Sequence, residues 1–240
     1  MLYQNNPFDN NSTYSSFCFS CPLINTCSYM RSDYGLKKPL FSVKLGEQIL
    51  SPNNFKIAYP FLPDSEENQA RKRINDGITN EVSELFKIQI LQPEAIDFKD
   101  ITASYETMLN QSRLLSILFE LYEYVDGAAH GYTLYSSITA DTNTGTIYSF
   151  SNLFNGSINY VSYLNELAKQ YIKDNDITLI NEYNGITPNQ KFYLTPDNLV
   201  LYYQVYDYTP YAYGLLKIPI PYSKIQNLLS QNSPIKRLIE

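Results

Sequence analysis

The side chains that could do chemistry in this 240-residue chain are few, and the cysteines fall in one short segment. Cys18 and Cys21 have the Cys-x-x-Cys spacing of a metal knuckle or a redox pair, and Cys27 follows. A structural zinc site takes four ligands, and neither a fourth cysteine nor a nearby histidine is present. Ordinary thiols in a flexible arm are the favoured interpretation, with cross-links between chains as an alternative. We therefore predict no metal site, and the three cysteines are the candidates if one exists.

The single histidine, His130, lies in the segment Gly127-Ala-Ala-His-Gly131. Its small neighbours allow tight turns and a close approach of the backbone to another group. His130 could contact a ligand or act as a general base. It could instead pack in its loop and hydrogen-bond across it, which we favour because the spacing ties no nucleophile or carboxylate pair to it. Phosphate-binding, dinucleotide-binding and hydrolase motifs are also missing, so we predict that the protein is not an enzyme and needs no cofactor.

Tyrosine is the commonest aromatic residue, with 23 copies beside no tryptophan, and several lie between residues 202 and 213. If a strand runs through residues 199–208, Tyr202, Tyr206 and Tyr208 share one of its faces. Tyrosine buries a ring and keeps a hydroxyl for hydrogen bonds, which suits protein interfaces and sugar stacking. The same residues could simply build a sheet face that helices cover. Taken with the histidine segment, the predicted ligand-binding residues are Ala129, His130, Gly131, Tyr206 and Tyr211.

The charge balance and the apolar pattern exclude two kinds of partner. Acidic residues outnumber basic ones by 24 to 18, so we expect that the protein does not bind nucleic acid. The most apolar stretch, residues 114–125, is short and contains two glutamates, so we predict no membrane span. The first residues also lack a basic segment before an apolar run, as a signal peptide would have. We therefore expect a cytoplasmic protein, or one associated with a spore or envelope layer.

The elements that position these residues follow from hydrophobic periodicity. Residues 1–36 form an Asn-, Tyr- and Cys-rich arm, and residues 37–240 form a folded domain with an N-terminal part (37–110) and a C-terminal part (111–240). Helices are expected at 65–87 with Asp64 in a capping box, after Ser157, and around 225–229. Strands are expected at 55–61, 101–109, 114–125, 132–142, 192–194, 199–208 and 215–218. Tight turns between neighbouring strands predict an α+β fold, an antiparallel sheet with helices packed on one side.

Several segments, in this order, resemble a domain of unknown function that ends RsiV-type anti-sigma factors and accompanies PdaC-type peptidoglycan deacetylases. Ala128 differs from the glycine of the family's Gly-Gly-Ala-His-Gly. The matching segments are Tyr59-Pro60, Ile74-Asn75, Gly127–Gly131, Asp141–Gly145, Ser151–Phe154, Phe192–Thr195, Leu199–Leu201, Tyr206, Pro210–Ala212, Gly214 and Ile218–Tyr222.

The resemblance implies an α+β domain for extracytoplasmic recognition, with no catalytic residues of its own. RsiV-type members bind lysozyme, so the implied partner is a protein such as lysozyme or a cell-wall glycan. The membrane helix and the sigma-binding segment of RsiV-type proteins have no counterpart in this sequence. The predicted function is therefore non-enzymatic recognition without a membrane anchor. The alternative is a structural protein of a spore or envelope layer, because tyrosine and cysteine can both form cross-links.

Overall fold

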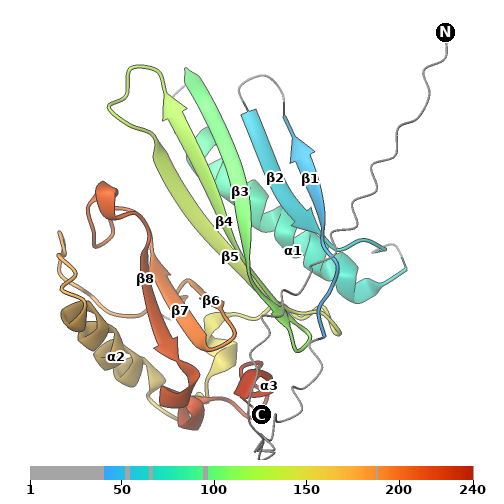
Figure 1. Ribbon diagram of the computed structural model, residues 1–240, viewed down its shortest axis with the longest axis vertical. Helices are drawn as coiled ribbons and strands as arrows, with labels where there is room; N and C mark the ends of the chain where they lie inside the picture. Colours follow the sequence, from blue (N-terminus) through green and yellow to red (C-terminus); the bar gives the residue numbers. More distant parts are fainter. Residues whose placement is uncertain (1–40, 52–54, 65–66, 94–96, 188, 240) are drawn as a thin grey trace, which may run out of the picture. The chain divides into compact units, whose positions relative to one another are not determined.

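The computed structural model describes residues 41–51, 55–64, 67–93, 97–187 and 189–239, and Figure 1 shows their arrangement. The described residues belong to one unit, which runs from Lys38 to Glu240. The predicted arm, with Cys18, Cys21 and Cys27, lies outside the described residues. The predictions made for the arm and for its cysteines therefore stay predictions.

Five strands form the first sheet, in the order of the chain. They are β1 (Gly46–Leu50), β2 (Phe55–Phe61), β3 (Phe98–Gln111), β4 (Leu114–Val125) and β5 (Tyr132–Asp141). The last three form an antiparallel meander, whereas β2 and β3 are parallel, with Phe55 opposite Ile101. The connection from β2 to β3 passes through a helix, which is the kind of crossover that parallel strands need. The α+β class is thus confirmed, and the sheet is mixed at this one pair.

Helix α1 (Gln69–Phe86) begins at a different cap from the one predicted. The Asn68 side chain accepts hydrogen bonds from the backbone N–H groups of Ala70 at 3.0 Å and Arg71 at 3.1 Å. Asp64 instead adopts a left-handed conformation with φ +57° and pairs with Arg71 at 3.2 Å. The predicted capping box was therefore wrong, because a second residue with the same chemistry lies closer to the apolar stripe.

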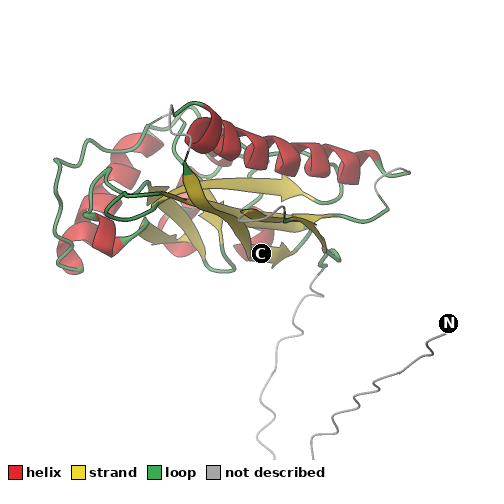
Figure 2. Cartoon of the chain, turned by 90° about the horizontal axis from the view of Figure 1, so that it is seen from above, coloured by secondary structure: helices red, strands yellow, loops and turns green. Residues whose placement is uncertain are grey.

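The buried stripe of α1 packs on one face of the first sheet, as Figure 2 shows for the long helix. Ile74 and Ile78 lie in one apolar cluster with alternate residues of β4, from Leu115 to Leu121. Gly77 belongs to the buried stripe, and a Cβ there would lie 2.8 Å from the Cδ1 atom of Ile138. Glycine inside a helix normally only weakens it, but here it also allows the helix to approach the sheet closely. A π-helical turn, η1 (Lys87–Leu91), continues the helix.

A second sheet contains β6 (Phe192–Leu194), β7 (Asn198–Tyr203) and β8 (Leu216–Pro221), all antiparallel. The predicted hairpin of β6 and β7 is confirmed, but β7 ends at Tyr203. Tyr206 and Tyr208 therefore lie beyond the strand, and the prediction that they share a face with Tyr202 was wrong. Helix α2 (Tyr160–Asp174) covers this sheet, and Asn159 caps it in place of the predicted Ser157 by accepting from the Ser162 N–H at 3.2 Å.

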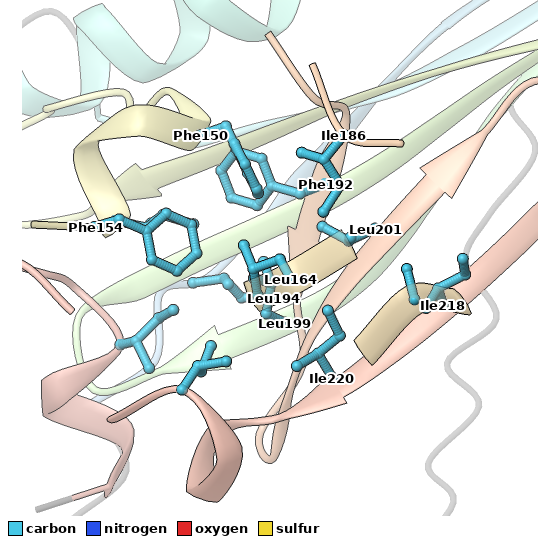
Figure 3. Packing of buried hydrophobic residues seen from close by; sticks show 14 of the residues in the cluster. Phe150, Phe154, Leu164, Ile186, Phe192, Leu194, Leu199, Leu201, Ile218 and Ile220 are labelled. Atoms are coloured by element: carbon cyan, nitrogen blue, oxygen red, sulfur yellow. The ribbon is translucent and has the colours of Figure 1, made fainter. Parts of the chain in front are cut away.

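The two faces of β7 belong to two different cores. Leu199 and Leu201 lie with Leu164 of α2 in the core that Figure 3 shows. Val200 and Tyr202 point the other way and cluster with Leu118 of β4. The second sheet thus packs between α2 and the face of the first sheet opposite α1.

The C-terminal segment differs from the prediction of one short helix around residues 225–229. Two 3-10 turns, η4 (Tyr222–Lys224) and η5 (Gln226–Leu228), precede α3 (Lys236–Ile239). Leu229 is extended and forms a β-bridge with Phe154, so tertiary pairing replaces a continuous helix. Within the described ranges, the helices all fall short of the length and apolar character that crossing a bilayer requires.

Candidate functional site

The residues predicted to bind a ligand meet where the β4–β5 loop faces η3 (Tyr211–Tyr213). The Tyr211 ring stacks on the His130 imidazole, with ring centroids 4.2 Å apart and an interplanar angle of 20°. The Tyr206 hydroxyl lies 3.1 Å from Nε2 of His130. We call these three side chains the histidine–tyrosine cluster. Ala129 and Gly131 flank His130 in the same loop, so all five predicted residues lie together, while their binding of a ligand stays a prediction.

The hydrogen bonds of the imidazole assign its proton. Nδ1 lies 2.7 Å from the carbonyl oxygen of Gly131, and a carbonyl can only accept, so Nδ1 carries a hydrogen. In the neutral ring, Nε2 then accepts a hydrogen bond from the Tyr206 hydroxyl. His130 is therefore hydrogen-bonded within its own loop, as the packing interpretation expects, and it is also exposed. No described carboxylate hydrogen-bonds to this ring.

Glycine is required on both sides of His130 for different reasons. Gly127 turns the chain after β4 with φ +78°, a conformation that other residues rarely adopt. Gly131 is buried, and a Cβ there would overlap the Tyr122 ring and the backbone oxygen of Glu123. The loop is thus held tightly against β4. Tyr122 of β4 is the side chain against which the loop packs, and no sequence motif had distinguished it.

The turn after β7 places the two tyrosines of the histidine–tyrosine cluster. Tyr206 has φ +71°, and Asp207 fixes the turn by accepting from the Gln204 N–H at 2.8 Å. The Gln204 side chain pairs with the backbone of Tyr135 on β5, donating to its oxygen at 2.8 Å and accepting from its N–H at 2.9 Å. The strained position of Tyr206 is therefore supported by contacts to the first sheet. Gln204 looks like any polar turn residue in the sequence, so its role could not have been predicted.

A pocket of about 580 Å³ lies beside this turn and shares its residues Gln204 and Asp207. Its remaining walls come from residues 181–187 and 189–191 and from Tyr202, Tyr203 and Tyr208. Burial raises the pKa of Tyr183, a neighbour of this wall, to about 12, and it also raises the pKa of Tyr203. These phenols stay neutral at physiological pH and can donate hydrogen bonds. The pocket could not be predicted from the sequence, because its two walls lie in separate segments of the chain.

The described residues hold no group of three or more His, Cys, Asp or Glu side chains that could bind a metal ion. The only metal candidates of the sequence, Cys18, Cys21 and Cys27, lie outside this part of the chain.

Part of this chain matches a known protein family, and solved structures share its fold. Residues 151–223 match the family described as a protein of unknown function, DUF3298. A DUF3298 domain is therefore present. It includes Tyr206 and Tyr211 of the cluster, whereas His130 precedes it. The predicted similarity to a domain of unknown function is confirmed, and its link to RsiV-type and PdaC-type proteins stays a prediction.

Two solved structures of DUF3298 family proteins resemble this chain. A member from Bacteroides fragilis is 18% identical, with a TM-score of 0.56 over 83% of this chain and 99% of its own. A member from Pseudomonas aeruginosa is 17% identical, with a TM-score of 0.58 over 82% of this chain and 98% of its own. At this identity the similarity shows that this chain has the same fold as these two proteins. No curated protein matches the chain.

Proposed function

We propose that the domain after residue 36 is a non-enzymatic recognition domain, which binds a protein or a cell-wall glycan through the histidine–tyrosine cluster. The observation that carries this proposal is the stacked pair of His130 and Tyr211 on the surface, with Tyr206 bonded to the imidazole. These rings come from two segments that the fold brings together. The resemblance of the surrounding motifs to RsiV-type domains supports lysozyme or peptidoglycan as the ligand.

The geometry of the histidine–tyrosine cluster suits recognition. The Tyr206 residue is 41% exposed although its hydroxyl is hydrogen-bonded, so it presents an apolar ring to solvent in a fixed orientation. Aromatic side chains supply a large share of binding energy at protein interfaces. Because the rings are already ordered, binding loses little side-chain entropy.

The surroundings of His130 also support a role without catalysis. Its two ring nitrogens engage a backbone carbonyl and a phenol, and neither partner is a carboxylate that would orient the ring as a base. The alternative function, a spore or envelope layer, depends on the composition of residues 1–36, which lie outside the described residues.

Calorimetric titration of the full chain with a lysozyme and with soluble peptidoglycan fragments tests the proposal. We expect one of the two to bind, and Tyr211→Ala to weaken binding by about 2 kcal/mol, as loss of a central aromatic contact does. Tyr213→Ala is the matched control, because Tyr213 is 47% exposed on the same 3-10 turn and lies outside the cluster. A folded wild type that binds neither ligand would refute the proposal, as would equal losses in the two variants.

A further inference from the structure

The pocket beside the 204–208 turn has the features of a second, separate ligand site. Its volume of about 580 Å³ lies in the range of sites for small molecules. One wall comes from residues 181–187 and 189–191, and the other is the end of β7 with the turn that follows it. None of the three side chains of the histidine–tyrosine cluster lines it.

The walls of the pocket are joined by hydrogen bonds. The Ile180 N–H donates to the Tyr208 carbonyl at 2.9 Å, and the Asn181 side chain donates to the Asp207 carbonyl at 2.8 Å. On the far side of the loop, the Ile186 N–H donates to the Asn165 side chain of α2 at 2.7 Å. The pocket therefore exists before any ligand arrives, and binding needs little reorganisation.

The polar lining is rich in amides and is held in place. Gln190 is only 6% exposed, and its Nε2 donates to the carbonyls of Lys191 and Tyr202, both at 3.1 Å. Within the described ranges no group donates to its Oε1 atom, which leaves this oxygen as an acceptor for a ligand hydroxyl. The Asn181, Asn184 and Asn189 side chains add further amide groups to the lining.

The charged groups of the lining argue against an anionic or an apolar ligand. The lining contains two carboxylates, Glu182 and Asp207, and one lysine, Lys191, so an anion would meet a net negative site. None of these three forms an ion pair with another described residue. An apolar ligand would cover their polar groups without replacing the hydrogen bonds to water.

Tyr208 is the partly exposed aromatic residue of the lining, whereas Tyr203 beside it is only 8% exposed. The rings of Tyr203 and Tyr208 pack edge to face, 5.0 Å apart, and Tyr183 packs against both. A sugar ring has an apolar C–H face that packs on such rings, and its hydroxyls both donate and accept hydrogen bonds. We infer that this pocket binds a saccharide of one or two sugar rings that carries no anionic group. This goes beyond the proposed function because it assigns a different site.

The test is titration of the full chain with four sugars, observed by protein NMR chemical shifts and by calorimetry. The probes are N-acetylglucosamine, its β-1,4-linked dimer, cellobiose and maltose. We expect saturable binding of at least one probe at millimolar concentration. Asn184→Ala should weaken it about fivefold, as the loss of one hydrogen bond does. Asn189→Trp should abolish binding by filling the pocket.

Two controls make the result specific. Asn143→Ala changes an exposed asparagine outside the pocket and should leave sugar binding unchanged. Tyr211→Ala should also leave it unchanged, so the pocket and the histidine–tyrosine cluster can fail separately. Absence of saturable binding for all four probes would overturn the inference. So would binding that persists undiminished in folded Asn189→Trp.

Discussion

Ser116 joins the two sheets through hydrogen bonds inside the core. Its hydroxyl oxygen on β4 accepts from the Leu194 N–H of β6 at 3.0 Å and lies 2.8 Å from the Thr139 hydroxyl of β5. Ser116 and Leu194 are fully buried, and Thr139 is 2% exposed. The Leu194 N–H points away from β7, because the next residue, Thr195, donates to the Asn198 carbonyl at 2.9 Å and successive N–H groups of a strand point to opposite sides. Ser116 therefore satisfies the Leu194 N–H, which β7 does not pair.

Replacing Ser116 by alanine should leave two buried polar groups, the Leu194 N–H and the Thr139 hydroxyl, without their partner. Each unpaired buried group costs about 1–3 kcal/mol, so we expect the free energy of unfolding to fall by about 2–6 kcal/mol. Urea unfolding followed by circular dichroism measures this change, with an unchanged m value as the sign of the same unfolding reaction. Adding Thr139→Val should restore part of the loss, because it removes one of the two unpaired groups.

The matched control is Ser104→Ala, which removes a serine hydroxyl bonded at 2.7 Å to Glu120 near the surface of the same sheet. We expect this change to stay within about 0.5 kcal/mol of wild type. If Ser116→Ala costs no more than Ser104→Ala, the two sheets do not depend on this contact and the reasoning is wrong.

Two further predictions concern the stability of the fold. Burial alone would raise the pKa of Asp141, but two backbone N–H groups and Arg237 at 2.9 Å outweigh it and lower the pKa. Asp141 therefore stabilises the fold above its unfolded pKa of about 4, and the stabilisation is lost as the pH falls through the lower folded pKa. The difference in unfolding free energy between wild type and Asp141→Asn should accordingly be largest near neutral pH and shrink below about pH 4, which urea titrations across pH will show. Gly77→Ala should lower the unfolding free energy by about 1 kcal/mol, because overpacking against the Ile147 and Ile138 side chains exceeds the gain of about 1 kcal/mol in helix propensity. A more stable variant in the same urea titration would show that these two isoleucine side chains give way.

Local pattern was sufficient for much of the secondary structure. The strands at 55–61 and 114–125 have the predicted bounds, and the apolar stripe of α1 faces the sheet. These features depend on the side-chain period of 2 or 3.6 residues, which a single segment contains in full. The helix starts were harder, because Asp64 and Asn68 offer the same capping chemistry and only the path of the chain chooses between them.

The candidate site, too, could be predicted only in part from the sequence. The glycines around His130 and the tyrosines near Pro210 drew attention in the sequence, and these residues do meet. The contact itself depends on the end of β7 at Tyr203 and on the left-handed turn at Tyr206, which the assumed longer strand did not include. The pocket lined by residues 181–187 and 189–191 had no signal in the sequence.

The sequence by itself determined the α+β class, most strands and the residues worth testing, since composition and periodicity are properties of neighbouring residues. Only the tertiary structure decided the parallel pairing of β2 with β3, the stacking of His130 on Tyr211 and the presence of the pocket. Each of these needs two segments to meet across a long stretch of chain. Their meeting is set by how the two sheets and the two longer helices bury their apolar faces together, which no single segment contains.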